Sequence, residues 1–135
     1  MKTLLAAVLL AFTGWLVVGC GNPAVENKAK VEAQWKAELH ALIAGDKAAF
    51  ENLLCFGSKS QATKVDMTLR VASGLAKAFN VQEADLRADS IAFNQEYTQA
   101  TVKVMLRDAK APGGWKPFSD PELWVRENGR WLRQL

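Results

Sequence analysis

The chain has 135 residues, of which 17 are Lys or Arg and 14 are Asp or Glu, so its formal net charge is +3. This length suits one domain, and the interspersed charges form no polybasic block, which argues against nucleic-acid binding. One histidine and two cysteines do not provide the usual zinc spacings, the carboxylates match no calcium loop, and the glycines form no phosphate-binding motif. We therefore expect neither a metal nor another cofactor.

Residues 1–19 have the three parts of a secretory signal peptide. Lys2 supplies a positive start, an apolar run extends from Leu4 to Val18, and the small residue Gly19 follows. The run is shorter than the roughly 20 apolar residues that a membrane-spanning helix needs. The pattern therefore favours a cleaved signal peptide over a retained transmembrane helix.

The segment Val17-Val18-Gly19-Cys20 resembles the lipobox of bacterial lipoproteins. In proteins with this motif the cysteine receives diacylglycerol, the chain is cut before it, and the new amine is often acylated. Two or three acyl chains anchor a protein stably, whereas one holds weakly. The resemblance implies that Cys20 is lipidated and that the protein is anchored in the cell envelope, facing the periplasm, more typically from the outer membrane. The alternative is an ordinary signal peptide with a chance cysteine.

After the signal we expect a lipidated cysteine and polar tether over residues 20–29, and one folded domain over residues 30–135. If Cys20 carries lipid, Cys55 has no partner for an internal disulfide. Cys55 lies in the apolar run Leu53-Leu54-Cys55-Phe56, which favours a small buried hydrophobe over a reactive thiol.

The first predicted helix covers residues 26–44 and ends at Gly45, since a glycine just past a helix end adopts the left-handed conformation readily. Glu38 is assigned to a polar face of this helix. The apolar stripe of the helix consists of Val31, Trp35, Leu39, Leu42 and Ile43.

Two further helices are predicted. Asp46 can cap a short helix over residues 47–54. A loop at residues 57–60 separates it from a third helix over residues 61–79.

The hydrophobic period then changes to two, which predicts strands over residues 86–96 and 100–108 and a turn at 111–114. The chain ends in a predicted β-hairpin, because residues 122–127 and 130–135 flank Asn128-Gly129, a sequence typical of a type I′ turn. This two-residue turn sets the register of the hairpin.

In that register Trp124 lies opposite Arg133 and Arg126 lies opposite Trp131. These four residues share one face, where arginines can stack on indole rings, while the other face carries Val125 and other apolar residues. Both faces are partly apolar, so the pattern leaves open which of them meets the helices.

The long helix leading through Gly45-Asp46 to the short helix with Leu53-Leu54, together with the hairpin from Leu123 to Leu132, resembles the nuclear transport factor 2-like superfamily. The likeness is greatest to its small bacterial lipoproteins of unknown function. The resemblance implies an α+β fold of the cystatin-like type, with N-terminal helices packed on a curved antiparallel sheet and a pocket at the open end of the cone. Members include isomerases and dehydratases that use Asp, His or Tyr as acid and base, and many proteins without known activity.

We expect no catalytic residue, because no position reproduces the isomerase pattern. His40 lies at the edge of the apolar stripe and is expected at the helix surface. Tyr97 falls at a strand end, and Asp85 and Asp89 share a strand face that can be solvent-exposed. The sequence leans against an enzyme.

The remaining candidates are aromatic and basic residues, which can fill the core, line a ligand pocket or form a partner surface; the core role is favoured for the tryptophans. We expect a membrane-anchored, non-catalytic module that binds a small apolar ligand or a protein partner. The alternatives are an isomerase- or dehydratase-like enzyme and a subunit of an envelope complex. The candidate binding residues are Trp35, Phe93, Trp115, Trp124, Arg126, Trp131 and Arg133.

Overall fold

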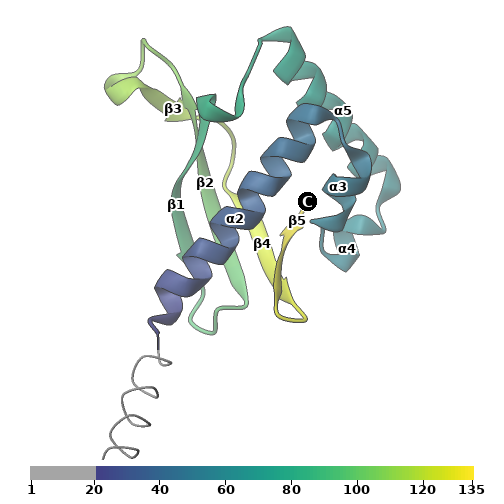
Figure 1. Ribbon diagram of the computed structural model, residues 1–135, viewed down its shortest axis with the longest axis vertical. Helices are drawn as coiled ribbons and strands as arrows, with labels where there is room; N and C mark the ends of the chain where they lie inside the picture. Colours follow the sequence, from purple (N-terminus) through teal and green to yellow (C-terminus); the bar gives the residue numbers. More distant parts are fainter. Residues whose placement is uncertain (1–20) are drawn as a thin grey trace, which may run out of the picture.

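The computed structural model of the protein describes residues 21–135. Its helical segments lie against a five-stranded antiparallel sheet, in which the order β1-β2-β4-β5 forms the main path and β3 pairs with β2 (Figure 1). The elements are α2 (Pro23–Ala44), α3 (Lys47–Asn52), α4 (Phe56–Lys59), α5 (Ala62–Ala78), η1 (Glu83–Asp85), β1 (Leu86–Phe93), β2 (Gln99–Arg107), η2 (Pro112–Gly114), β3 (Trp115–Pro117), β4 (Glu122–Glu127) and β5 (Arg130–Gln134).

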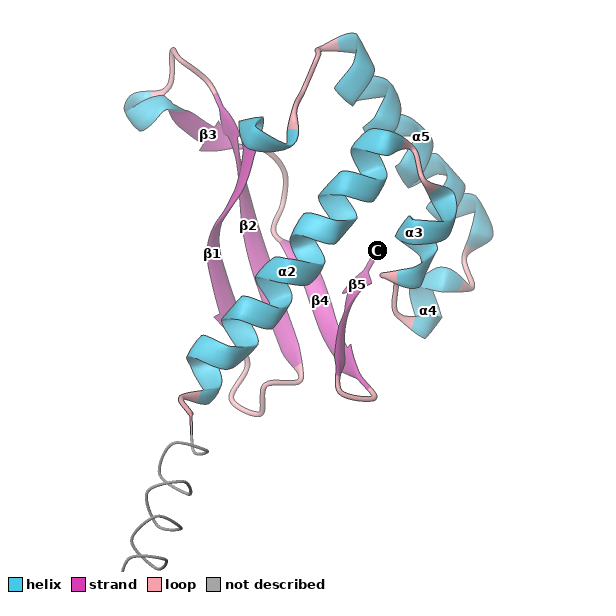
Figure 2. Ribbon diagram, viewed as in Figure 1, coloured by secondary structure: helices cyan, strands magenta, loops and turns pink. Residues whose placement is uncertain are grey.

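The long helix α2 crosses one face of the sheet, and α3, α4 and α5 gather beside the β5 edge (Figure 2). None of the helices within residues 21–135 is long and apolar enough to cross a membrane. The predicted signal peptide and Cys20 lie outside the described residues.

Helix α2 begins at Pro23, three residues before the predicted start. The side-chain oxygen of Asn22 accepts a hydrogen bond from the Ala24 N–H at 3.0 Å, and a proline suits the first turn because its missing N–H would be unpaired there. Residues 23–29, which were expected to belong to the polar tether, are therefore helical. At its other end the helix stops as predicted, at Gly45 with φ 69°.

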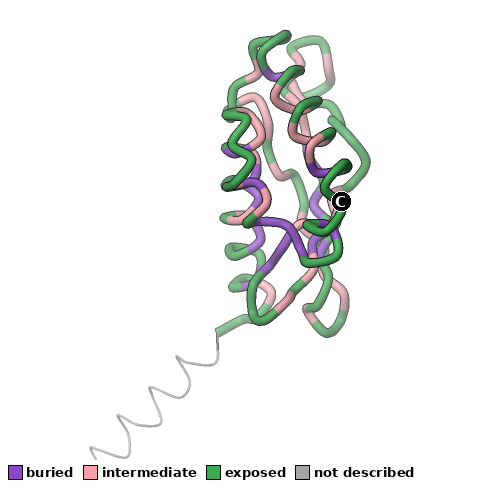
Figure 3. The backbone as a smooth tube through the Cα atoms, turned by 90° about the vertical axis from the view of Figure 1, so that its right-hand side faces the viewer, coloured by how far each residue is buried: buried purple, intermediate pink, exposed green. Residues whose placement is uncertain are grey.

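Two apolar clusters hold these elements together, and the buried stretches lie on the inner sides of the helices and strands (Figure 3). The first joins α2 to the sheet and contains Val31, Trp35, Ala100, Val102, Val104, Trp124 and Trp131. The second joins α2, α3 and α5 and contains Ala41, Phe50, Leu54 and Val65. Both clusters are formed entirely within residues 21–135, so a chain that begins at residue 20 keeps every contact described here.

The hairpin has the predicted register, with Trp124 paired to Arg133 and Arg126 to Trp131. Asn128 and Gly129 have φ values of 51° and 78°, as a type I′ turn requires. The question of which face meets the helices is answered by burial, because Trp124 and Trp131 are 0% and 1% exposed in the cluster that includes α2.

Three short elements differ from the sequence-based expectation. Helix α3 ends at Asn52 and α4 replaces an expected loop, because the chain between them pairs with β5: Cys55 N–H donates to the Arg133 carbonyl, and Arg133 N–H donates to the Leu53 carbonyl. These bonds occupy part of an otherwise open sheet edge. Strand β3, which was not predicted, is held by pairing with the end of β2.

Replacement of either Gly129 or Gly74 by alanine tests the turn. Neither glycine has a heavy atom within 4 Å of an added Cβ, so crowding plays no part in either change. Gly129→Ala should lower the free energy of unfolding by about 1–2 kcal/mol, because the left-handed backbone disfavours a Cβ. Gly74→Ala, inside α5, should raise it by about 1 kcal/mol. Urea unfolding measures both; an unchanged stability for Gly129→Ala would contradict the turn geometry.

Candidate functional site

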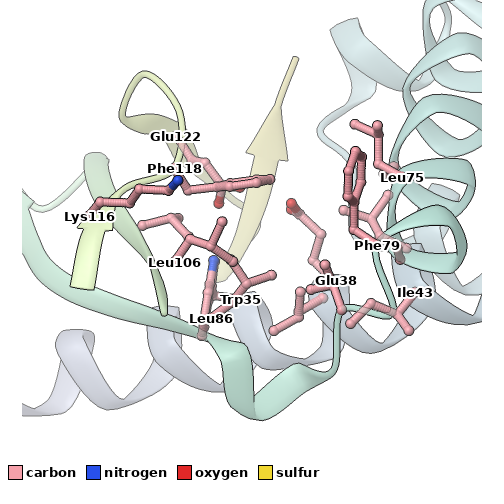
Figure 4. A pocket seen from close by; sticks show the side chains of 16 residues that line it. Trp35, Glu38, Ile43, Leu75, Phe79, Leu86, Leu106, Lys116, Phe118 and Glu122 are labelled. Atoms are coloured by element: carbon pink, nitrogen blue, oxygen red, sulfur yellow. The ribbon is translucent and has the colours of Figure 1, made fainter. Parts of the chain in front are cut away.

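A cavity of about 400 Å³ lies between the C-terminal half of α2, the C-terminal half of α5 and the sheet (Figure 4). This volume falls in the range of small-molecule sites, which is roughly 300–1,000 Å³. Most of its lining is aliphatic or aromatic, including Leu39, Leu42, Leu75, Phe79, Leu106 and Phe118.

The rim of the cavity is apolar as well. Phe79 is 74% exposed, Phe118 is 50% exposed and Leu75 is 48% exposed, although all three line the cavity. Large apolar side chains that remain exposed around a hollow are typical of a binding site. The cavity therefore offers an apolar molecule a continuous apolar path from solvent to interior.

The polar end of the cavity is built by Glu38 from α2, Glu122 from the start of β4 and Arg133 from β5. The Arg133 Nε lies 3.5 Å from Glu38 Oε2 and 3.9 Å from Glu122 Oε2. The two carboxyl side chains line the cavity, and Figure 4 shows that of Glu38 pointing from the helix into it. We call these three residues the carboxyl cluster.

Local sequence explains why the cluster forms. Glu38 follows Val31 by seven residues and Trp35 by three, so it lies on the buried side of α2. Glu122 is two residues before Trp124 and therefore shares its face of β4. Arg133 pairs with Trp124 across the hairpin, which brings the guanidinium to the same face.

The cluster contains buried polar atoms without partners among residues 21–135. Glu38 is only 3% exposed, yet neither its Oε2 nor Glu122 Oε2 accepts a hydrogen bond. The Nε of Arg133 and the Nε1 of Trp124, beside the cluster, donate none. Buried polar groups in native proteins are nearly always hydrogen-bonded, so each exception needs an explanation. Four such atoms at one end of an apolar cavity fit a place where a ligand supplies the missing partners.

The environment changes the protonation of both carboxyls. Burial, reinforced by the Glu122 charge, raises the pKa of Glu38 well above its usual value, against the opposing effect of Arg133. Burial also raises the pKa of Glu122, against the opposing effects of Arg133 and of the Trp124 and Trp35 side chains. Since two carboxyls share one guanidinium, the cluster is neutral when one of them keeps its proton.

The sequence-predicted candidates do not form one surface. Trp35 lines the cavity, whereas Trp124 and Trp131 are buried in the core. Phe93 packs on Trp131 with ring centroids 5.5 Å apart, and Arg126 is exposed on the hairpin.

The expected stacking of arginines on the hairpin tryptophans is replaced by other contacts. Arg133 turns to the two glutamates, because the buried carboxyls attract its charge. The arginine–indole contacts occur instead at Trp115, which has Arg87 at 4.4 Å and Arg107 at 5.2 Å from its ring.

The acid–base candidates considered from the sequence lie elsewhere. His40 is at the surface, as expected, where its Nδ1 lies 3.0 Å from Glu83 Oε1. Asp85 and Asp89 pair with arginines on the sheet, and Tyr97 occupies a turn with φ 54°. Cys55 is buried, and its Sγ donates to Ser58 Oγ at 3.3 Å. None of these residues lines the cavity.

The assignment of Glu38 to a polar face of its helix is wrong, and Glu122 was not considered. A signal for Glu38 was present in its spacing from Val31 and Trp35, both of which were placed on the apolar stripe. Within residues 21–135, no group of three or more His, Cys, Asp or Glu side chains is arranged to hold a metal ion.

Comparison with known proteins identifies the fold. No family model matches the chain, and no curated protein matches it. Among solved structures, a Campylobacter jejuni protein named as a candidate NTF2-like transpeptidase is similar, with a TM-score of 0.55 and 16% identity over 85% of this chain and 99% of that chain. The chain therefore has the NTF2-like fold, which confirms the predicted α+β class with helices packed on a curved antiparallel sheet.

The raised pKa of Glu38 predicts how stability changes with pH. Below about pH 4.3, the usual pKa of a glutamate in an unfolded chain, the side chain is protonated in both the folded and the unfolded state. Its titration then does not change the free energy of unfolding. As the pH rises further the unfolded state ionises first, so the free energy of unfolding falls until the folded pKa is passed. In Glu38→Gln, the free energy of unfolding should therefore fall less steeply with pH. Urea unfolding at a series of pH values from 4 to 9 measures this change.

Asp108→Asn is the matched control, because the pKa of that partly exposed carboxyl is shifted in the opposite direction. The N–H of Lys110 and the ammonium of Lys116 lower the pKa of Asp108, so its contribution to stability is lost as the pH falls. This variant should alter the profile only below about pH 4. A Glu38→Gln profile as steep as that of the wild type would contradict the assignment.

Proposed function

We propose that this protein is a lipid-anchored lipoprotein of the bacterial envelope whose domain binds a small, largely apolar molecule. The observation that carries the binding proposal is the apolar cavity of about 400 Å³, lined at one end by two carboxyls that each have a buried oxygen without a hydrogen bond. Apolar surface removed from water drives binding at roughly 25 cal/mol per Å², and a few polar groups fix the orientation of the ligand.

The position of the cavity on α2 supports this arrangement. The helix starts at Pro23, three residues after the proposed lipidation site Cys20, whereas the cavity begins at Trp35 and extends past Leu42. At 1.5 Å per residue, Leu42 lies about 28 Å along the helix from Pro23. A lipid at Cys20 would thus leave the cavity at the end of the domain away from the membrane, open to the periplasm.

The name of the structural neighbour does not supply an activity for this chain. Peptidyl transfer through an acyl intermediate needs a nucleophile beside a base, and the cavity lining contains no Ser, Thr or Cys. The thiol of Cys55 lies in another part of the domain, against Ser58. Binding without acyl transfer agrees better with these residues.

Proton transfer is the second candidate, because a buried carboxyl whose pKa is raised, as that of Glu38 is, can act as a general acid or base. An isomerase or dehydratase here would use Glu38, in place of the expected histidine or aspartate. Incubation with an enolisable cyclic ketone in D₂O distinguishes the two functions. Exchange of the α-hydrogens that disappears in Glu38→Gln would establish proton transfer, while binding without exchange favours the non-catalytic module.

Cys20→Ala tests the membrane anchor. Because the proposed acyl chains are attached through this cysteine, the variant should lose metabolic labelling with an alkyne fatty acid and should leave the membrane fraction or accumulate unprocessed. Cys55→Ala is the matched control and should retain labelling. Labelling that persists in Cys20→Ala would rule out the lipobox assignment.

Ala72→Phe tests the cavity as the binding site. Ala72 lines the cavity from α5, whereas Ala78, exposed on the same helix, does not. In a chain starting at residue 20 with Cys20→Ser, binding of the uncharged fluorescent probe N-phenyl-1-naphthylamine should weaken at least about tenfold in Ala72→Phe, because the ring occupies the apolar volume. The same substitution at Ala78 should leave binding unchanged. Equal binding by both variants would place the site elsewhere.

A further inference from the structure

We propose that the cavity selects an amphiphilic primary amine, whose ammonium group sits between Glu38 and Glu122 while its hydrocarbon part fills the apolar space. This inference rests on the proposed binding function and adds the chemical class of the ligand. It follows from the count of donors, acceptors and charges at the inner end of the cavity.

Hydrogen-bond acceptors outnumber donors at this end. The two carboxyls present four oxygen atoms, each able to accept more than one hydrogen bond, whereas the unpartnered donors beside them are two, Arg133 Nε and Trp124 Nε1. Within residues 21–135, neither Glu38 Oε2 nor Glu122 Oε2 accepts a hydrogen bond. The Nη1 of Arg133 is already committed to the carbonyl oxygens of Leu123 and Gln134, at 3.1 and 2.6 Å. An ammonium group brings three donors and no acceptor, which is the complement that the cluster lacks.

The charges favour the same ligand. With both glutamates ionised, the cluster carries one negative charge in excess of Arg133, and a buried net charge is costly. Without a ligand, a retained proton removes that excess. A bound ammonium group can replace the proton, so that two carboxylates meet two cations. A carboxylate ligand would add a third negative charge, and an alcohol would leave the proton in place.

The other walls carry one further charged side chain. From α5, β1 and β2 the lining residues are apolar, and the remaining charged lining residue, Lys116 of β3, pairs with Asp108 at 3.2 Å. Glu38 on α2, Glu122 on β4 and Arg133 on β5 are therefore the groups that decide the pH dependence. Amine binding should release about one proton wherever the empty cluster is protonated.

Calorimetric titration with n-octylammonium, 1-octanol and octanoate tests this inference on the chain that starts at residue 20 with Cys20→Ser. The amine should bind at least about tenfold more tightly than the alcohol, because hydrogen bonds to charged groups are the stronger ones, and octanoate should bind most weakly. Titrations in phosphate and in Tris, whose ionisation enthalpies differ, measure the released proton.

Glu38→Gln should weaken amine binding by about tenfold and abolish proton release, while octanol binding is kept. Glu83→Gln is the matched control, since that glutamate is exposed beside His40 and outside the cavity. If Glu38→Gln does not fold, the wild type still tests the inference. Its affinity for the amine should rise with pH above the usual glutamate pKa of about 4.3 and below the ammonium pKa of about 10.4, while its affinity for octanol stays constant.

The outcomes separate this inference from the proposed function. Octanol binding as tight as amine binding, or amine binding without proton release, would overturn the amine inference and leave the apolar site intact. Absence of binding by all three compounds and by the naphthylamine probe would overturn both.

Discussion

The position of α2 on the sheet depends on Trp131, which meets the helix in two ways. Its indole N–H donates to Asn27 Oδ1 at 3.1 Å, and its carbonyl accepts from Gln34 Nε2 at 3.1 Å. One residue of β5 thus binds α2 at points two turns apart. From Gln34 to Glu38 the helix rises about 6 Å, and from Trp131 to Arg133 the strand advances about 6.6 Å. This match brings Glu38 to Arg133 once Trp131 is in place.

The carboxyl cluster contributes little to the stability of the fold. Removing charges from water costs several kcal/mol per ion, and a buried ion pair recovers this only with good geometry and further hydrogen bonds. Here the distances to Arg133 are 3.5 and 3.9 Å, and the unpartnered atoms remain. Apolar residues would suit this position better if stability alone mattered. The loss of stability from burying these groups has an explanation if the cluster recognises a ligand, because the bound ligand would then supply the missing hydrogen bonds.

Sequence reasoning succeeded where structure is local and failed where it depends on distant partners. The hairpin register followed from Asn128-Gly129, since a two-residue turn determines every pair beside it. The end of α3 and the presence of α4 depend on hydrogen bonds that Leu53 and Cys55 make with Arg133, which is far from them in the chain. At the site, Trp35 was predicted as a candidate binding residue and lines the cavity, but Glu38 was assigned to a polar face of its helix. The assignment relied on the charge of Glu38 and not on its spacing from Val31 and Trp35. Arg133 was identified without its partners, since the inward face of the hairpin was undecided.

The early start of α2 changes how a lipid anchor at Cys20 would hold the domain. With the helix beginning at Pro23, only residues 21 and 22 separate Cys20 from it, and two extended residues span at most about 7 Å. The helix bonded to Trp131 at Asn27 and Gln34 also carries Glu38, so it would link the proposed anchor directly to the cavity. A flexible tether would let the cavity face any direction, including its own membrane. If Cys20 carries lipid, a helix that starts two residues later would instead restrict how far the cavity can approach that membrane, and would favour ligands that arrive from the periplasmic side.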